Sequence, residues 1–424
     1  MLTEQNELAA FGGPRAIPEG AIAGWPRIEQ RDKDAVMRVL DRGTLWGAAA
    51  PEVTALQQEW ATYLGARHCL ATNSGTAALH MAVAAAGVEP GDEVITTPLS
   101  WTSTATCILH HNAIPIFADI DLETFNIDPA RIAERITPRT KAILPVHLYG
   151  LAADMDPVVA LAERHGLKIV EDACQASGAR YRGRPVGSIG DLGAFSFNGN
   201  KTLAGGEGGA LVTDDPTLWE EAARVQQFGE RRRTDGAREY NAYGMGWMYR
   251  TTELTAAFVR SQLTRLDEFN AAIRANAHDL SRQLADLRGV HVPVEPPERE
   301  HVFFRYVVRF APEELGLDPA LGEATEKVRR ALHAEGVALG RAEFVIPGMT
   351  LFREKRGYGK GCPWTCQYNQ PIEYRAEDYP NAVRAIDSLI PLMGLTPPNG
   401  EELMAGYVRA FEKVFAQIER VMAS

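Results

Sequence analysis

Lys201 and Asp172 are the two residues whose types and placement most directly indicate chemistry. The apolar run at 168–172 ends in Asp172, and Lys201 follows in a segment that leads into the glycine-rich run at 204–209. A lysine amine can form a Schiff base with a carbonyl carbon, and a carboxylate can keep a pyridine nitrogen protonated. Taken singly, they would be a solvated lysine and a helix cap. Together they predict a pyridoxal 5'-phosphate site with Lys201 and Asp172 as its catalytic residues.

A second set of residues is suited to hold a phosphate group. Gly75 and Thr76 open an alanine-rich segment with helical character at 76–86. The first N–H groups of a helix lack backbone partners and bind anions, and a glycine lets the anion approach closely. Ser196, just upstream of Lys201, offers a hydroxyl to the same phosphate. Without a ligand these residues would form an ordinary helix cap and strand end, so this prediction depends on Lys201 and Asp172.

Two further residues are candidates for contacts with the cofactor ring. Trp101 follows an expected strand end, and its flat side chain could cover one face of a ring, although a core tryptophan is the alternative. Gln175 lies three residues after Asp172 and could donate to the phenolate oxygen. His147 also follows a strand end, and we expect it to be a packed residue behind the site. Our predicted cofactor-binding residues are therefore Gly75, Thr76, Trp101, Asp172, Gln175, Ser196 and Lys201.

These residues fall where strands are expected to end. From about residue 56 to 213, β-rich runs alternate with helical stretches such as 76–86 and 155–165. We expect strands at 93–98, 115–119, 142–146, 168–172, 193–197 and 209–213. Such alternation forms a mostly parallel sheet covered on both faces, which binds ligands at the carboxyl ends of its strands. The sequence therefore predicts an α/β fold with the site at one edge of the sheet.

Length and pattern predict more than one structural unit, because 424 residues exceed a typical single domain. We expect an N-terminal arm at 1–50, a large cofactor-binding domain at 51–274 and a small α+β C-terminal domain at 275–424. Within them we expect helices at 31–40, 252–269, 325–335 and 401–421 and a strand at 302–308. The loop-rich stretch at 344–391 could be functional or an ordinary insertion.

Composition narrows the class of protein. The formal charge of −11 argues against a nucleic-acid-binding protein, because such proteins usually carry a basic excess. Two short basic clusters, at 231–233 and 353–360, are either solvated loops or sites that recognise an acidic substrate or a partner subunit. Cys362 and Cys366 lack the spacing and the second ligand pair of a zinc site, so we expect no metal.

Location is predicted from the cysteines and the first residues. The five scattered cysteines do not form a disulfide framework and fit a reducing cytoplasm. The polar, acidic start lacks the features of a signal peptide, and no apolar run reaches the roughly twenty residues that span a bilayer. We expect a cytoplasmic globular protein without membrane contact.

The motifs together resemble the DegT/DnrJ/EryC1/StrS family of sugar and cyclitol aminotransferases, strongly over residues 10–270 and loosely beyond. The matching stretches are 72–79, 91–95, 145–147, 171–175, 190–197 and 206–209. The resemblance implies fold type I, similar to aspartate aminotransferase, and an obligate homodimer with sites at the interface. The segments at 12–14 and 43–46 are similar to members that act on cyclitols such as scyllo-inosose. The run at 204–209 is similar to that subgroup and to the aminohydroxybenzoate synthases.

Carried onto this sequence, the resemblance implies a role for each residue predicted above. Lys201 would be the Schiff-base lysine and general acid/base, and Asp172 would lie at the pyridine nitrogen. Gln175 would lie near the phenolate oxygen and Trp101 would stack on the ring. The phosphate would be held by Gly75, Thr76 and Ser196.

One position departs from the family pattern. Members usually carry an asparagine before the long helix, and it reaches the phosphate of the neighbouring subunit. Met248 occupies that position here and cannot donate a hydrogen bond. Either Asn241 or Arg250 substitutes for it, or the phosphate has one contact fewer.

These observations predict a pyridoxal-phosphate-dependent aminotransferase that aminates a keto sugar or keto cyclitol in natural-product (antibiotic) biosynthesis. The expected amino donor is glutamate or glutamine. Two alternatives remain open: a dehydratase that forms aminohydroxybenzoate and keeps its lysine, and a non-catalytic cofactor-binding partner protein.

Overall fold

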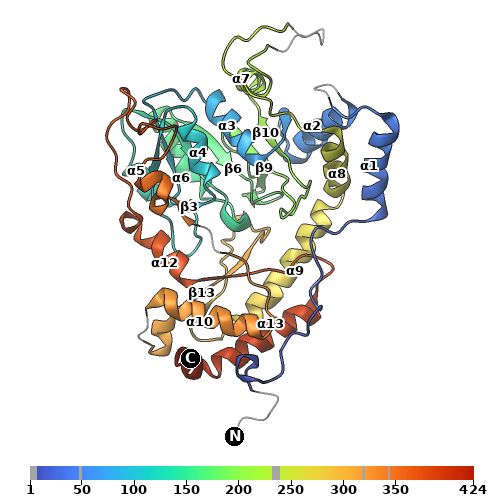
Figure 1. Cartoon of the computed structure of the whole chain (residues 1–424), viewed down its shortest axis with the longest axis vertical. Helices are drawn as coiled ribbons and strands as arrows, with labels where there is room; N and C mark the ends of the chain where they lie inside the picture. The colour runs from blue at the N-terminus through green and yellow to red at the C-terminus, as the bar shows by residue number, and fades with distance from the viewer. Residues whose placement is uncertain (1–6, 47–49, 232–238, 318–319, 342–343) are drawn as a thin grey trace.

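A seven-stranded sheet forms the centre of the larger part of the molecule (Figure 1). The computed structural model describes residues 7–46, 50–231, 239–317, 320–341 and 344–424. In spatial order the strands are β1 (His68–Thr72), β10 (Gly209–Thr213), β9 (Leu192–Ser196), β6 (Lys168–Asp172), β5 (Thr140–Leu144), β2 (Glu93–Thr96) and β4 (Ile114–Phe117). The pairs from β9 to β4 are parallel, and β10 runs antiparallel to both of its neighbours. The mostly parallel α/β sheet is thus confirmed, with β1 as a strand that we did not predict.

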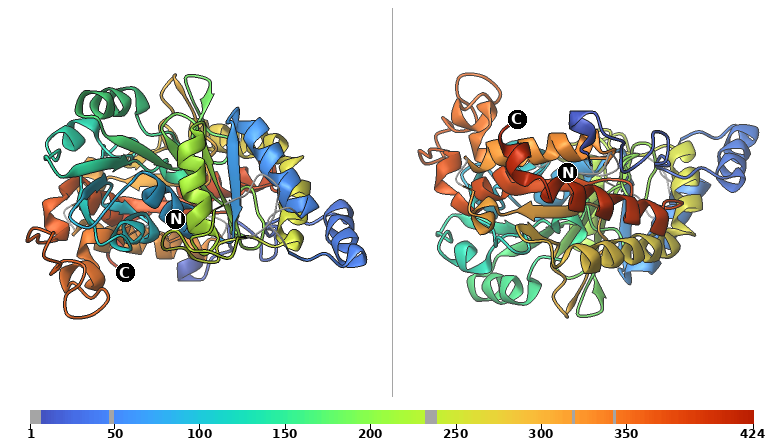
Figure 2. Two further views of the ribbon diagram at one scale, coloured as in Figure 1. Left: turned by 90° about the horizontal axis from the view of Figure 1, so that it is seen from above. Right: turned by 90° about the horizontal axis from the view of Figure 1, so that it is seen from below.

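Helices cover both faces of this sheet, as the view from above shows (Figure 2). Successive strand residues point to opposite faces. In β10, Ala210 and Val212 pack with α2 (Pro51–Leu64) and α6 (Met155–His165), whereas Leu211 packs with α3 (Gly75–Ala85) and α7 (Pro216–Gln226). Each large apolar side chain buried in this way contributes about 1.5–3 kcal/mol. The two apolar layers fix the sheet between its helices.

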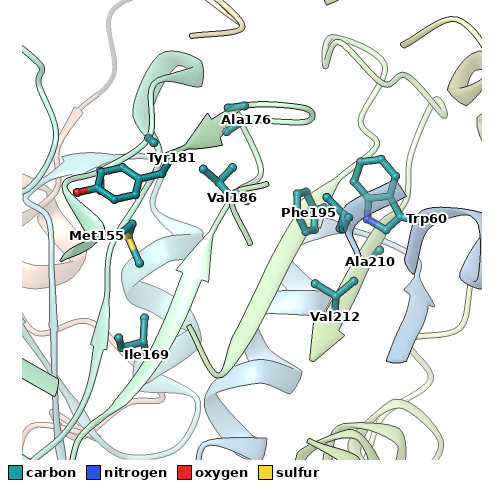
Figure 3. Close-up of a cluster of buried hydrophobic side chains, with 14 of the residues drawn as sticks. Trp60, Met155, Ile169, Ala176, Tyr181, Val186, Phe195, Ala210 and Val212 are labelled. Carbon is teal, nitrogen blue, oxygen red and sulfur yellow. The ribbon is translucent and has the colours of Figure 1, made fainter. Parts of the chain in front are cut away.

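Aromatic packing around β9 sets the direction of Ser196. The Trp60 ring lies edge-on to the ring of Phe195, with centroids 5.0 Å apart, and to that of Phe197, with centroids 5.7 Å apart. Figure 3 shows Trp60 and Phe195 in this buried cluster. Because side chains alternate along a strand, Ser196 points to the opposite face. The core therefore directs the Ser196 hydroxyl toward the start of α3.

The smaller part contains three antiparallel strands and several helices. Its sheet is β11 (Val290–His291), β13 (Tyr306–Phe310) and β15 (Leu389–Leu392), covered by α10 (Leu321–Ala334) and α13 (Glu401–Phe415). The helix α9 (Leu266–Leu284) runs between the two parts (Figure 1). The predicted boundary at 274/275 falls inside α9, and the division into three segments stays a prediction. The first described residues contribute Leu8 and Ile17 to the core of the smaller part.

The predicted helix at 252–269 is wrong as a single element. The structure has α8 (Glu253–Leu263) and then α9, with non-helical backbone at Arg265. The buried Arg265 guanidinium binds both carboxylate oxygens of Asp32, at 2.9 and 2.8 Å, on α1 (Gln30–Arg42). This buried ion pair occupies the turn at which the helix direction changes. Apolar spacing continues on both sides of the turn, so the pattern alone did not reveal the break.

Other predicted elements also differ in extent. The strand expected at 302–308 begins only at Tyr306, because Phe303 has a positive φ of 47°. The helix expected at 401–421 divides into α13 and α14 (Ile418–Met422). The stretch at 344–391 is not simply loop. Its elements are β14 (Phe344–Val345), α11 (Thr350–Arg353) and α12 (Pro380–Ser388), and it packs around Phe117 of β4.

Within the described residues, no helix combines the length and apolar character needed to cross a bilayer. No group of three or more His, Cys, Asp or Glu side chains in this part of the chain is placed to hold a metal ion. All five cysteines are free. Of the basic cluster at 231–233, residues 232 and 233 lie outside the described residues.

Candidate active site

A cavity of about 340 Å³ lies at the carboxyl ends of β6 and β9, between the larger and smaller parts. All seven sequence-predicted residues line it: Gly75, Thr76, Trp101, Asp172, Gln175, Ser196 and Lys201. Parallel strands bring their carboxyl ends to one edge of a sheet, and that edge is where open α/β sheets bind ligands. The structure thus brings together residues that are widely separated along the chain.

The start of α3 forms the end of the cavity suited to a phosphate. Ser74 caps the helix by accepting a hydrogen bond from the Ala77 N–H at 3.0 Å. The N–H groups of Gly75 and Thr76 precede any intrahelical acceptor and carry the positive end of the helix dipole. A Cβ at Gly75 would lie 2.8 Å from both Cys174 Sγ and Ser196 Cβ. Only glycine therefore fits there, and this cradle fits a phosphate group.

Asp172 is held in place at the floor of the cavity and is almost fully buried. Its Oδ2 accepts a hydrogen bond from Thr104 Oγ1 at 2.8 Å, and its Oδ1 accepts from the Cys174 N–H at 3.2 Å. Thr104 in turn bonds to Ser100 Oγ at 2.9 Å. These bonds orient the carboxylate, which suits it to hold a protonated ring nitrogen. Burial, reinforced by the Asp172 charge, raises the pKa of Cys174, so its thiol stays neutral.

Lys201 lies in the turn after β9 and is fixed through its backbone. Its N–H donates to the Asn198 carbonyl at 2.9 Å, and its carbonyl accepts from Trp25 Nε1 at 2.9 Å. Its Nζ lies 4.2 Å from the centre of the Phe304 ring, a cation–π contact. Phe304 comes from the segment just before β13, so the smaller part closes over the lysine.

Trp101 and Gln175 have different surroundings. The Trp101 side chain is half exposed, with its ring centre 5.7 Å from that of Phe344. Gln175 is buried, and its Oε1 accepts from the Tyr149 N–H at 2.9 Å. The amide NH₂ is the donor end of this side chain, and a phenolate oxygen would take its hydrogen bond from that end. Both residues are placed to contact a ring in the cavity, and their roles stay predictions.

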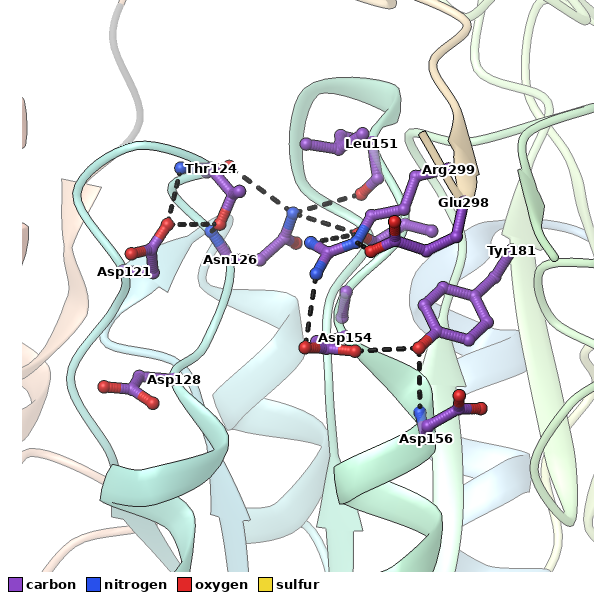
Figure 4. A network of polar contacts seen from close by, with 12 residues as sticks. Asp121, Thr124, Asn126, Asp128, Leu151, Asp154, Asp156, Tyr181, Glu298 and Arg299 are labelled. Carbon is purple, nitrogen blue, oxygen red and sulfur yellow. Dashed lines mark hydrogen bonds and ion pairs between the residues drawn. The ribbon is translucent and has the colours of Figure 1, made fainter. Parts of the chain in front are cut away.

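The loop that positions Gln175 belongs to a polar network (Figure 4). Asn126 Oδ1 accepts from the Leu148 N–H at 3.0 Å, and its Nδ2 donates to the Leu151 carbonyl at 3.2 Å. Asp154 accepts from Tyr181 Oη at 2.8 Å and pairs with Arg299 at 3.3 Å. The network ties the segment around Tyr149 to the approach to the smaller part.

Behind the site, His147 and Glu171 are both fully buried, outside the cavity lining. Glu171 accepts from His147 Nε2 at 2.9 Å and from the N–H groups of Gly187, Ile189 and Gly190 at 2.6–2.7 Å. Burial raises the pKa of Glu171, but the His147 partner and the backbone donors outweigh burial and lower it below its usual value. The pair anchors β6 next to Asp172, consistent with the packed role expected of His147.

Met248, the residue that departs from the family pattern, lies near the end of the cavity suited to a phosphate. The Met248 side chain is about half exposed, and its carbonyl accepts from Asn73 Nδ2 at 3.4 Å. The Asn73 N–H donates to the Tyr249 carbonyl at 2.8 Å. Neither Asn241 nor Arg250 lines the cavity of its own chain. A contact from either residue to a phosphate would therefore have to reach a neighbouring copy.

The sequence did not predict the lining residues Phe304, Arg305 and Arg341, nor Thr104, which is outside the lining and donates to Asp172. Thr104 could have been found, because it lies in the first turn of α4 (Ser103–Leu109) just after Trp101. The other three residues belong to the smaller part of the molecule. Pairing of β14 with β3 (Leu99–Ser100) brings Phe344 to Trp101, and no local sequence pattern indicates that pairing.

The site defines a class of protein. An α/β sheet with a lysine, an aspartate and a helix start around one cavity is the arrangement of pyridoxal-phosphate enzymes with the aminotransferase fold. The chain belongs to the DegT/DnrJ/EryC1/StrS aminotransferase family, which matches residues 26–367. Members of this family are pyridoxal-phosphate-dependent aminotransferases. The resemblance noted from the motifs is confirmed.

Comparison with known proteins supports the same family. The L-glutamine:2-deoxy-scyllo-inosose aminotransferase of Streptoalloteichus tenebrarius is 38% identical over 323 residues, 73% of this chain and 75% of that protein. The crystal structure of S. venezuelae DesV in complex with a ketimine intermediate superposes with a TM-score of 0.77 at 32% identity, covering 92% of this chain and 94% of DesV. The crystal structure of 3-amino-5-hydroxybenzoic acid synthase superposes with a TM-score of 0.82 at 28% identity, covering 93% of this chain and 98% of the synthase.

Proposed function

We propose that this chain transfers an amino group from glutamine or glutamate to a keto sugar or keto cyclitol of the scyllo-inosose type, in natural-product biosynthesis. The observation that carries the proposal is the single cavity in which Lys201, Asp172 and the start of α3 meet. The named glutamine-dependent inosose aminotransferase supports the donor and the acceptor class. Free cysteines fit the predicted cytoplasmic location.

The residues present fit pyridoxal 5'-phosphate. The N–H groups of Gly75 and Thr76 and the Ser196 hydroxyl would hold the phosphate, Asp172 the ring nitrogen, Gln175 the phenolate oxygen and Trp101 one ring face. When bound, the cofactor supplies a carbonyl carbon that takes up an amine and a ring that accepts electrons. Asp172 contributes by keeping a proton on the ring nitrogen, because a carboxylate stabilises the positive charge there.

Lys201 would act as the proton carrier. A primary amine moves a proton to or from carbon when it is held within reach and its pKa is lowered by its surroundings. The backbone bonds at Lys201 fix where its side chain starts, and the Phe304 ring limits where Nζ can go. The same amine would remove a proton from the donor Cα and later deliver one to the carbon that receives nitrogen.

The rest of the lining suits a hydroxyl-rich ring. Ser100, Ser103, Asn198 and Asn200 present hydroxyl and amide groups to the cavity. Neutral donors and acceptors bind ring hydroxyls and reject analogues that lack them, because buried polar groups would then be unpaired. This lining supports a sugar or cyclitol acceptor.

A homodimer is part of the proposal. Trp46, Phe228, Tyr243, Met245 and Met248 expose large apolar side chains, with Met245 at 79% and Trp46 at 68% exposure. The Arg250 guanidinium lies 5.5 Å from the centre of the Trp46 ring and 6.0 Å from that of the Phe228 ring. The three chain segments that carry these residues therefore meet at one place. Apolar side chains gathered in this way favour contact with a second copy. Sedimentation at micromolar concentration should give twice the 46.4 kDa mass of the chain.

The function is tested with purified protein loaded with pyridoxal phosphate, glutamine or glutamate, and a panel of keto sugars and keto cyclitols. Mass spectrometry should detect a product in which the ketone oxygen is replaced by an amine. The Lys201→Ala variant should form no product and retain no borohydride-fixed cofactor, whereas Lys141→Ala, at an exposed position of β5, should behave like the unaltered chain. Loss of water from the substrate without amine transfer would instead support the aminohydroxybenzoate-type alternative. An adduct fixed in Lys201→Ala would contradict the lysine assignment.

A further inference from the structure

A second cavity adjoins the cavity that contains Lys201. Its volume is about 440 Å³, and Asn200 and Phe304 line both cavities. Gly199 and Thr202, which lie on either side of Lys201 in the turn after β9, line the second cavity as well. This turn therefore borders open space, and packing fixes such a segment less firmly than it fixes the core. We expect individual hydrogen bonds to decide where the lysine lies.

One of these hydrogen bonds comes from a distant segment of the chain. The indole Nε1–H of Trp25 donates to the Lys201 carbonyl at 2.9 Å. Two other bonds lie inside the turn. The Lys201 N–H donates to the Asn198 carbonyl at 2.9 Å. The Gly199 N–H donates to the Gly206 carbonyl at 2.7 Å. The local bonds give the turn its shape, whereas the Trp25 bond ties the turn to another part of the molecule.

Trp25 is itself held in place by its surroundings. The chain at 21–27 runs beside α9 between the smaller part and α1 (Figure 1), and the Trp25 ring lies edge-on to the ring of Phe269 on α9, with centroids 5.0 Å apart. Two residues earlier, Ala23 exchanges two hydrogen bonds with the Asn399 side chain of the smaller part, at 2.9 and 3.2 Å. The indole therefore reaches the lysine turn from a fixed support.

We propose that Trp25 is a positioning residue for Lys201: its indole N–H holds the lysine backbone at the place from which Nζ reaches the reacting carbon. The inference rests on the proposed function, in which Lys201 carries the proton. Such a transfer is sensitive to distance, and a displacement of about 1 Å can cost about a hundredfold in rate. Because Ala23 is bonded to Asn399, the position of the lysine also depends on how the smaller part holds the arm.

Trp25→Phe tests this role, because phenylalanine keeps an aromatic ring beside Phe269 and removes the N–H donor. Rapid mixing of the holoenzyme with glutamine should show a single-turnover rate lowered about tenfold, as expected for a lost hydrogen bond that also loosens the lysine. The glutamine concentration that gives half the maximal rate should stay within about twofold, since Trp25 lies outside the lining of the cavity that contains Lys201.

Trp364→Phe is the matched control. It also removes one indole hydrogen bond, which Trp364 Nε1 donates to Tyr374 Oη at 3.3 Å, and it lies outside the lining of both cavities. This variant should leave the single-turnover rate and the half-saturating glutamine concentration unchanged.

Hydrogen–deuterium exchange gives a readout that does not depend on activity. In Trp25→Phe, the peptide that covers residues 198–206 should exchange about threefold faster or more, with and without bound cofactor. The peptides of β6 and β9 should keep their exchange rates. A general loss of stability would instead speed exchange throughout the core.

Asn399→Ala tests whether the arm carries the effect. This change removes both side-chain bonds to Ala23 but keeps the backbone carbonyl at 399, which accepts from Asn276 Nδ2 at 2.9 Å. Exchange in the peptide at 198–206 should rise by a smaller factor than in Trp25→Phe. The double variant should exceed Trp25→Phe alone by little, because both changes act through one bond.

Three results would overturn the assignment: unchanged exchange at 198–206 in Trp25→Phe, equal losses of rate in Trp25→Phe and Trp364→Phe, or effects of Trp25→Phe and Asn399→Ala that add in full. If the unaltered chain transfers no amine from any donor, the proposed function is wrong. The exchange experiment still decides whether Trp25 holds the turn that carries Lys201.

Discussion

At the scale of single residues, Asp172 shows how a buried charge is prepared for one task. Thr104 and the Cys174 N–H bind its two oxygens from different sides, which fixes the plane of the carboxylate. A carboxylate in this position favours the positive form of a ring nitrogen by opposite-charge pairing. Its contribution is therefore expected to be electronic, with folding carried by the surrounding core.

Asp172→Asn should accordingly keep the fold and bound cofactor but slow proton transfer by about two or more orders of magnitude. The asparagine preserves the size of the side chain and an oxygen that accepts from Thr104, but it removes the negative charge. Rapid mixing with glutamine, followed by cofactor absorbance, measures the single-turnover rate. Thr104→Val, which removes one orienting bond and keeps the charge, should have a smaller effect of about tenfold. Single-turnover rates near normal in Asp172→Asn would remove this residue from the mechanism.

The sequence predicted the part of the site that the large sheet builds. Lys201, Asp172 and Gly75 are recognisable because strand ends, a helix start and glycines have local patterns. Arg341 and Phe304 could not be predicted as site residues. Their positions depend on how the smaller part packs over the sheet, and the chain gives no local sign of that contact.

At the scale of elements, the turn between α8 and α9 depends on a buried ion pair. Asp32 accepts from Arg265, from Ser261 Oγ at 2.6 Å and from the Glu29 N–H at 2.7 Å. Burial raises the pKa of Asp32, but these hydrogen bonds and the Arg265 charge outweigh it and lower the pKa overall. The carboxylate thus joins α1 to the point where α9 begins.

Removing that carboxylate should destabilise the protein strongly. Asp32→Ala removes the carboxylate that binds the buried Arg265 guanidinium through both oxygens and leaves only Glu29, at 3.1 Å, so we expect a cost of up to about 3–5 kcal/mol. Asp34→Ala, on the same helix but exposed, should change the free energy of unfolding by less than about 0.5 kcal/mol. Urea unfolding followed by circular dichroism compares the two variants. Equal midpoints would show that the ion pair does not stabilise the turn.

At the scale of the whole molecule, the Met248 position links cofactor binding to the proposed dimer. The family asparagine would add a donor to the phosphate of the neighbouring subunit, and losing such a bond without compensation costs about 1.5–3 kcal/mol. We expect Asn241 or Arg250 of the second copy to compensate. Met248→Asn should then change cofactor loss during dialysis by only a fewfold. Tenfold or better retention in that variant would mean that the native site lacks a donor.

Buried histidines give the folded chain a defined pH dependence. His80 contacts the rings of His110, His111 and Trp247, with centroids 4.6–4.8 Å apart, and bonds to Tyr249 Oη at 2.9 Å. Burial, with the charges of the neighbouring histidines, lowers the pKa of His80 to about 3. Burial likewise lowers the pKa of His111 to about 4 and that of His301 to about 3.

These histidines should make the protein less stable as pH falls below about 6.5. In the unfolded chain each takes up a proton near its ordinary pKa of 6.5, whereas in the folded chain it stays neutral until a much lower pH. The unfolded state therefore binds more protons between about pH 6.5 and 4, and stability is fully present only above that window. Each histidine contributes up to about 1.4 kcal/mol per pH unit within it. Urea unfolding at pH 7.5 and 5.0 should show this loss, and His80→Asn should reduce it. A loss of equal size in His80→Asn would show that His80 is not one of the groups responsible.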